Sequence, residues 1–385
     1  MKKNAIAAAL LACIGTMAQA EDNTTIFGLI DLNITNTKGG APVGSPTLTQ
    51  MNDGTVNGLN GSRWGIRSYE DLGGGLRAGV HLESGFFADT GSSAQGGRLF
   101  GRQGFVYLSQ PSAGELRLGR QYVLEDSVMC ATTPFTPNCN SLTLNPGTAI
   151  TNRGVGLPFW LNAPRADNVV MYQTPSFGGA YAAVQWAPGE NTFDTFHGLK
   201  LAYTGGPLTV AASYEWSNPR TGIVIPANLN IDPKGPINKS ITFGSNYDFG
   251  PARLYLGYQS NDNLVANPGA NQNGALLGFA NLTVSDGTTT FPMKKSSGPT
   301  VGVGVPIGSW LLGVNYTRMK FEGPSTVPAT LGQTEHLTLG KAGIGAVYSL
   351  SKVTFLYASI SEATGDLKDQ INQKTVSQVG LRKAF

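Results

Sequence analysis

Charged side chains alternate with apolar ones early in the chain, in a pattern suited to a wall that separates water from an apolar phase. Arg63 and Arg67 share one parity, while Trp64 and Ile66 between them share the other. A β-strand turns successive side chains to opposite faces, so both arginines would lie on one face. Guanidinium groups stay charged at physiological pH, and a row of them beside water could therefore screen solutes by charge.

The next segment repeats this arrangement, because Arg77, His81 and Glu83 share one parity and the residues between them are mainly apolar. A shift of one residue would place arginines in hydrocarbon, at about 2–4 kcal/mol for each one near the bilayer midplane. We therefore expect the charged face to line a water-filled lumen. Parity adds five further lumen residues: Asp31, Arg165, Asp167, Arg253 and Arg382.

Catalysis has little support in the sequence. The three histidines, His81, His197 and His336, lie far apart, and none has a serine beside it in a nucleophile motif. Clusters with metal-ligand spacing are absent from the sequence, so we predict no catalytic residue, no metal and no cofactor. His81 beside Glu83 leaves two interpretations open, a proton-linked gate or a solvated polar pair.

Sixteen short segments of alternating polarity follow one another along the chain, and the last of them spans residues 375–385. Seven tight turns rich in Gly, Pro, Asp and Ser alternate with longer loops, as in an up-and-down barrel. The sequence predicts an all-β fold, a 16-stranded antiparallel transmembrane β-barrel. The segments centre on Ile30, Ile66, Val80, Val106, Leu118, Val170, Val184, Leu201, Ala212, Phe243, Leu256, Val303, Val314, Ile344, Phe355 and Leu381.

Residues 99–109, the fourth segment, are apolar on both faces, which would fit a wall covered inside by a folded loop and outside by a neighbouring subunit. Aromatic residues near segment ends, Trp186, Trp310 and Tyr357 among them, are candidates for the rings that anchor such barrels at the membrane interface.

The N-terminus has the features of an export signal. Lys2 and Lys3 precede an apolar run, and small residues at 18–20 offer a cleavage site, so we expect a signal peptide at 1–20 and a mature barrel at 21–385. A lipoprotein cleavage box ending at Cys13 is the alternative. The apolar run is shorter than the roughly 20 residues of a membrane-spanning helix.

Composition agrees with a two-faced wall. Charged residues make up 13% of the chain, against about 25% in an average soluble domain, and there are 51 glycines. The formal net charge of +3 includes two lysines of the signal, so it gives no support to a nucleic-acid partner. In the exported chain only Cys130 and Cys139 are left, and in an oxidising compartment we predict that they form a disulfide; two free thiols are the alternative.

Eight short runs, in order along almost the whole mature chain, resemble the trimeric general porins of Gram-negative outer membranes, in their betaproteobacterial and neisserial branch. Each run is weakly specific alone, and their order gives the resemblance its strength. The runs are 26–31 (IFGLID), 62–67 (SRWGIR), 70–76 (EDLGGGL), 82–86 (LESGF), 100–103 (FGRQ), 118–122 (LGRQY), 247–250 (YDFG) and 379–385 (VGLRKAF).

The resemblance implies a homotrimer and a third extracellular loop, here residues 122–164, that folds inward and narrows the pore. It also implies that the arginine cluster of such porins corresponds here to Arg63, Arg102 and Arg165. The opposing acids on the loop would be Glu125 and Asp126. The terminal Phe385 corresponds to the assembly signal of such barrels. The two cysteines around the Pro-rich part of the loop depart from the family pattern.

Together these features predict an outer-membrane general diffusion porin for ions and small hydrophilic solutes, exported to the outer membrane and surrounded by lipid and lipopolysaccharide. We expect a weak anion preference, because the narrowest ring is arginine-rich. A membrane hydrolase would need a nucleophile beside a histidine, and a receptor-type barrel would need a plug domain, for which there is no room before Ile26. We predict neither.

Overall fold

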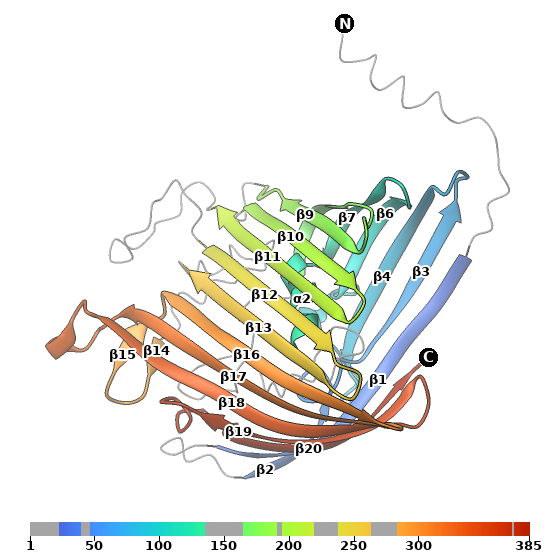
Figure 1. Ribbon diagram of the computed structural model, residues 1–385. Helices are drawn as coiled ribbons and strands as arrows, with labels where there is room; N and C mark the ends of the chain where they lie inside the picture. Colours follow the sequence, from blue (N-terminus) through green and yellow to red (C-terminus); the bar gives the residue numbers. More distant parts are fainter. Residues whose placement is uncertain are drawn as a thin grey trace, which may run out of the picture.

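The computed structural model describes residues 23–39, 47–134, 165–190, 195–218, 238–262, 283–371 and 373–385. Sixteen antiparallel strands form a closed barrel, in which the first strand pairs with the last (Figure 1). All sixteen predicted segment centres lie inside these strands. The strands are β1 (Asn23–Lys38), β3 (Arg63–Asp71), β4 (Arg77–Phe87), β6 (Gln103–Gln110), β7 (Gly114–Tyr122), β8 (Arg165–Gln173), β9 (Ala180–Ala187), β10 (Thr195–Gly205), β11 (Leu208–Asn218), β12 (Asn238–Asp248), β13 (Arg253–Asp262), β16 (Lys295–Ile307), β17 (Trp310–Pro324), β18 (Thr334–Ser349), β19 (Thr354–Thr364) and β20 (Thr375–Ala384).

The other elements are short. Within the described ranges, no helix has the length and apolar character needed to cross a membrane. Among the extra strands, β2 and β5 pair at the edges of barrel strands, and β14 and β15 form a separate hairpin. These elements are β2 (Leu48–Asp53), β5 (Ser92–Ser93), β14 (Thr283–Ser285), β15 (Thr290–Pro292), α2 (Leu124–Met129) and the 3-10 turns η1 (Gln95–Gly97), η2 (Cys130–Thr132) and η4 (Pro328–Thr330).

The two faces of the wall differ as the alternation predicts. In β12, Ile241 and Phe243 are exposed on the outside, whereas Ser240 and Thr242 are buried on the inside. Exposed large apolar side chains recur around the outer wall, which is the surface that lipid chains require. The polar residues therefore line the lumen.

The second barrel strand is interrupted, which the sequence did not reveal. β1 pairs with β3 over one half of its length and with β2 over the other half. The residues between β2 and β3, 54–62, turn into the barrel; we call them the inner turn. Residues 35–61 resemble one long external loop in sequence, but the structure differs, because β1 continues to Lys38 and β2 extends the wall.

Asp31 holds the inner turn in place. Its Oδ2 accepts hydrogen bonds from the backbone N–H groups of Leu59 (2.8 Å) and Asn60 (2.7 Å). The hydroxyl of Tyr357 donates to Oδ1 from the opposite side. Tyr357 is 3% exposed, so the prediction that it is an interfacial aromatic was wrong; it belongs to the lumen.

Gly380→Ala tests this packing. Gly380 of β20 pairs with Tyr357 of β19, and a Cβ at position 380 would overlap the tyrosine ring and lie 2.8 Å from the carbonyl oxygen of Leu32. We expect the free energy of unfolding to fall by about 1–3 kcal/mol, as for overpacking elsewhere. Unfolding by urea, followed by circular dichroism, measures it. Gly104→Ala is the matched control, because its Cβ would meet Phe100 at an ordinary 3.6 Å.

Candidate functional site

The start of the predicted constriction loop lies inside the barrel, where α2 faces the strands β9 to β13 (Figure 1). The backbone N–H of Leu124 donates to Gln185 Oε1 at 3.2 Å, and Lys200 Nζ donates to Ser127 Oγ at 2.8 Å. Residues 123–134 therefore run inward, as predicted. Residues 135–164 of the loop lie outside the described residues, as does Cys139, so the Cys130–Cys139 disulfide stays a prediction.

Glu125 is turned toward the barrel wall. Its carboxylate accepts hydrogen bonds from Ser240 Oγ at 2.9 Å and from Gln259 Nε2, and its backbone N–H donates to Glu215 Oε1 at 2.8 Å. The residue is 1% exposed. This arrangement fastens α2 to β11, β12 and β13. Of the two acids expected at the constriction, the geometry therefore leaves Asp126 as the one beside the open lumen.

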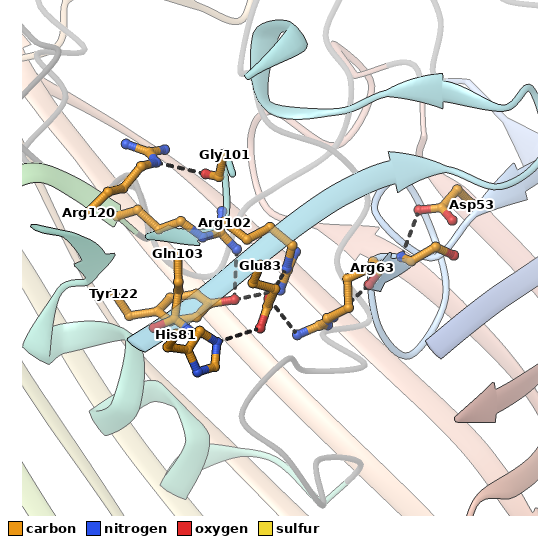
Figure 2. Close-up of polar contacts among 12 residues, drawn as sticks. Asp53, Arg63, His81, Glu83, Gly101, Arg102, Gln103, Arg120 and Tyr122 are labelled. Atoms are coloured by element: carbon orange, nitrogen blue, oxygen red, sulfur yellow. Dashed lines mark hydrogen bonds and ion pairs between the residues drawn. The ribbon is translucent and has the colours of Figure 1, made fainter. Parts of the chain in front are cut away.

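The carboxylate of Glu83 is the centre of the charged site (Figure 2). Its Oε1 forms an ion pair with Arg102 Nε and lies 3.6 Å from Arg63 Nη1. Its Oε2 lies 3.4 Å from His81 Nε2. Glu83 and Arg102 are 3% and 4% exposed, so the two guanidinium groups lie close together only because the carboxylate offsets their repulsion.

Tyr122 joins the third arginine to this group. Its hydroxyl accepts hydrogen bonds from Arg165 Nη2 at 2.8 Å and from Arg102 Nη2. The Arg165 guanidinium lies over the tyrosine ring, with Cζ 4.5 Å from the centroid, in a cation–π contact. The structure thus brings Arg63, Arg102 and Arg165 together from three separate parts of the chain.

A cavity of about 460 Å³ opens beside this cluster. Four arginines and two carboxylates line it, so the lining is positive, and Tyr122 and Ser127 of the loop region complete it. A positive lining across a narrow water-filled gap favours anions and orients dipolar solutes. The charged lining residues are Arg63, Arg67, Arg117, Arg382, Glu83 and Asp126.

Aromatic side chains support the guanidinium groups from within the lumen. The Phe105 ring of β6 stacks on His81 at 5.2 Å, and Arg117 Cζ lies 5.1 Å from the Phe105 centroid. Arg67 lies over Phe27 at 4.1 Å. The apolar inner face of the fourth strand is thus a platform for cationic side chains, and a folded loop is not needed to explain it.

Three predicted lumen residues lie away from the Glu83 cluster. Asp167 binds Arg98 Nη1 at 2.7 Å and also Arg120. Arg77 pairs with Asp71 at 3.7 Å, and Arg253 pairs with Asp248 at 2.5 Å, both at the barrel end that carries the short turns. These pairs are half-exposed. By contrast, Arg382 of β20 lines the cavity and lies over Phe355, with Cζ 5.2 Å from the ring centroid.

Sequence reasoning missed Lys341, on the lumen face of β18. The residue is 1% exposed, and its Nζ has no hydrogen-bond partner within the described part of the chain. Thr317 of β17 lies directly opposite. The signal was present, because Lys341 shares its parity with glycines at 343 and 345 and alternates with Ala342 and Ile344. Tyr122 and Arg117 were also missed.

The described residues contain no group of three or more His, Cys, Asp or Glu side chains that could hold a metal ion.

A closed barrel with an apolar outer wall, a charged interior and an inward loop defines a β-barrel channel of the outer membrane. A sequence profile of the Gram-negative porin family matches residues 5–368, and the chain belongs to this family. The protein is thus an outer-membrane porin, in a family of channels rather than enzymes, and it allows solutes to pass through a water-filled pore.

Similar proteins agree with this assignment. An outer membrane porin protein of Bordetella pertussis is 33% identical over 422 aligned positions that cover 100% of both chains. Outer membrane porin protein 32 of Delftia acidovorans is 34% identical over 262 positions, 66% of this chain and 68% of that protein. Among solved structures, the anion-selective porin from Comamonas acidovorans has a TM-score of 0.65 at 23% identity, covering 95% of this chain and 100% of that one. The trimer form of OmpT from Vibrio cholerae has a TM-score of 0.59 at 12% identity, covering 94% of this chain and 99% of that one.

Proposed function

We propose that this general diffusion porin prefers anions, and that Arg63, Arg102 and Arg165 form its constriction together with Asp126. The observation that carries this proposal is the excess of arginines over carboxylates around the lumen cavity, which Arg63 and Asp126 line. Arg102 and Arg165 do not line this cavity and join the cluster through Glu83 and Tyr122, which do. Arginine stays protonated under all working conditions, so the excess is permanent. The Comamonas protein of similar fold is itself named anion-selective, which supports the same preference here.

The reversal potential in a potassium chloride gradient tests this proposal. Purified protein in a planar bilayer should give a reversal potential of the sign expected for a pore that is selective for chloride. A potential of the opposite sign would reject the anion preference, and the absence of any conductance would reject the open pore. Arg117→Gln adds a second test, because removing a cation that lines the lumen cavity should lower the anion preference.

Assembly is the second part of the proposal. We infer a homotrimer in which the outer wall of β3 to β7 is covered by neighbouring subunits, while the rest of the wall contacts lipid and lipopolysaccharide. Val106, Leu108 and Leu118 on this wall are exposed in the single chain. The trimeric form of the structurally similar OmpT supports the inference. Light scattering of the detergent-solubilised protein measures the state, and a monomer would contradict it.

Phe385 has a related role in our proposal, as the terminal signal for barrel assembly. Its backbone N–H and carbonyl exchange hydrogen bonds of 3.0 Å with Gly28 of β1, so the last residue completes the closure of the barrel. The predicted signal peptide, residues 1–20, lies outside the described residues and stays a prediction.

The raised pKa of Asp126 predicts that the ion selectivity depends on pH. Burial raises the pKa of this loop carboxyl to about 7, against the opposing effect of Arg165, Arg102 and Arg63. The carboxyl is neutral below this pKa and negative above it. Anion preference should therefore increase when the pH is lowered from about 8 to about 6. Reversal potentials at both values measure the change.

Asp126→Asn should make the reversal potential much less dependent on pH and hold it near the low-pH value. His81 also lies in the lumen, so the difference between the wild type and the variant isolates the contribution of Asp126. The exposed Asp89→Asn is the control and should keep the full pH dependence. An equal pH dependence in all three proteins would remove Asp126 from the constriction.

A further inference from the structure

A second cavity, of about 340 Å³, lies in the lumen toward the barrel end with the short turns. Its size falls within the range of small-molecule pockets, roughly 300–1,000 Å³. Much of its lining is apolar, which is unusual for a wall that faces a water-filled pore. The apolar side chains include Leu59 of the inner turn, Pro134 of the loop, Tyr255, Leu311, Val347 and Phe355.

The apolar surface comes from lumen-facing positions of several strands. Leu311 of β17, Val347 of β18 and Phe355 of β19 gather around Leu59 from the inner turn. Pro134, at the described end of the loop, lies over Gly302 and Gly304 of β16, so closely that a Cβ at either position would come within 3.1 Å of the proline ring. The inner turn and the loop thus enclose this part of the wall, and an apolar group placed there would leave water.

One strong cation is directed into this cavity. Arg382 is 5% exposed, and its Nε has no hydrogen-bond partner among the residues that the structure describes. The only other charged groups of the lining, Arg253 and Asp248, form an ion pair with each other. The described lining therefore has a net charge of +1, located at a donor that lies over the Phe355 ring. Asp31 of β1 lies opposite Arg382 in the sheet, and its carboxylate is bound by Leu59, Asn60 and Tyr357.

We propose that this cavity binds organic monocarboxylates that carry an aromatic or aliphatic ring. The carboxylate would accept hydrogen bonds from Arg382, and the ring would pack against Leu311, Val347 and Phe355. A chloride ion or a sugar would leave the apolar surface unused, and a neutral amphiphile would leave Arg382 without a partner. A dicarboxylate would exceed the single positive charge.

Arg382 also lines the constriction cavity, so both cavities share this one cation. A carboxylate that crosses the constriction thus reaches the second cavity without leaving a positive side chain. The inference rests on the proposed function in this respect, since it assigns a preferred class of solute to the same lumen.

A comparison of benzoate with acetate distinguishes a specific binding site from a general attraction of anions. Each potassium salt is added to the protein in a planar bilayer, and the chloride conductance is recorded against the concentration. We expect benzoate and cyclohexanecarboxylate to reduce the conductance saturably, at concentrations about ten-fold lower than acetate, which corresponds to roughly 1.4 kcal/mol for the ring. Equal potency of the three salts in the wild-type protein would be enough to overturn the proposal.

Variants separate the two parts of the site. Arg382→Gln should weaken the effect of benzoate about ten-fold or more, and Leu311→Asn should bring benzoate close to acetate. Arg77→Gln is the matched control, because Arg77 lies toward the same barrel end but outside both cavities, and inhibition by benzoate should persist. Wild-type potency of benzoate in Arg382→Gln and Leu311→Asn would overturn the proposal.

The reversal potential in potassium chloride reports the proposed function separately. If the pore prefers potassium but benzoate still inhibits ahead of acetate, the anion preference fails and the binding site stands. If the pore prefers chloride but the carboxylates do not differ, the site fails and the anion preference stands.

Discussion

Glu83→Gln is expected to cause the largest loss of stability of any single conservative substitution in the lumen. The carboxylate is 3% exposed and lies against both Arg63 and Arg102. Without its charge, two guanidinium groups that are largely buried would face each other with no carboxylate to offset their repulsion. Breaking a buried ion pair by removing one partner costs about 3–5 kcal/mol, because the remaining charge is uncompensated. We expect a decrease of this size in the free energy of unfolding.

Urea unfolding in lipid vesicles, followed by tryptophan fluorescence, measures this decrease. Glu115→Gln is the matched control, because Glu115 pairs with Arg117 in the same lumen with side chains that are 26% and 32% exposed. Such a pair is worth about 1 kcal/mol or less. If the two variants unfold at the same urea concentration, the Glu83 cluster does not hold the constriction together.

The strands were predictable because one physical rule governs almost the whole wall. Lipid on one side and water on the other impose a period of two, so parity alone puts the charged residues Arg63, Arg67 and Glu83 on one face, and all three line the same cavity. The same rule would have found Lys341. Parity fixes the face of a residue, but it does not say which lumen residues touch.

The structure departs from the parity prediction where the backbone breaks the two-residue period of the strands. Asn168 has a positive φ of 58°, and the register between β7 and β8 shifts between Gly119 and Gln121. Parity therefore does not extend through the start of β8, and the partners of Asp167 could not be derived from it. The inner turn escaped prediction for a similar reason, since polar residues at 54–62 resemble an external loop unless their acceptor, Asp31, is known.

Two consecutive acids on a short helix are another case in which the sequence does not determine the contacts. Glu125 and Asp126 are adjacent in sequence, and the first turn of α2 directs them differently, so that Glu125 meets Ser240 and Gln259 while Asp126 lines the cavity. The family resemblance places both on the loop. The choice between them depends on how the loop docks on β12 and β13, which is a tertiary contact that local sequence does not encode.

Arg165→Glu is expected to produce the largest change in ion selectivity. Arg165 is the least constrained of the three arginines, because its Nη2 binds Tyr122 while its Nε has no partner among the described residues. Exchanging it changes the charge at the constriction by two units. Two unit charges at 4 Å interact by about 1 kcal/mol even in bulk water, so the permeability ratio of chloride to potassium should fall by roughly an order of magnitude.

Reversal potentials in a potassium chloride gradient measure this shift, and Arg165→Gln should fall about halfway between the wild type and Arg165→Glu because it changes one unit of charge. Lys352→Glu is the matched control, since it makes the same change of two units on an exposed turn outside the lumen. That control should shift the potential far less, because salt screens exposed charges beyond about 10 Å at 0.1 M. A shift of equal size in Arg165→Glu and Lys352→Glu would mean that selectivity follows the overall charge of the protein, and Arg165 would then have no place at the narrowest point of the pore.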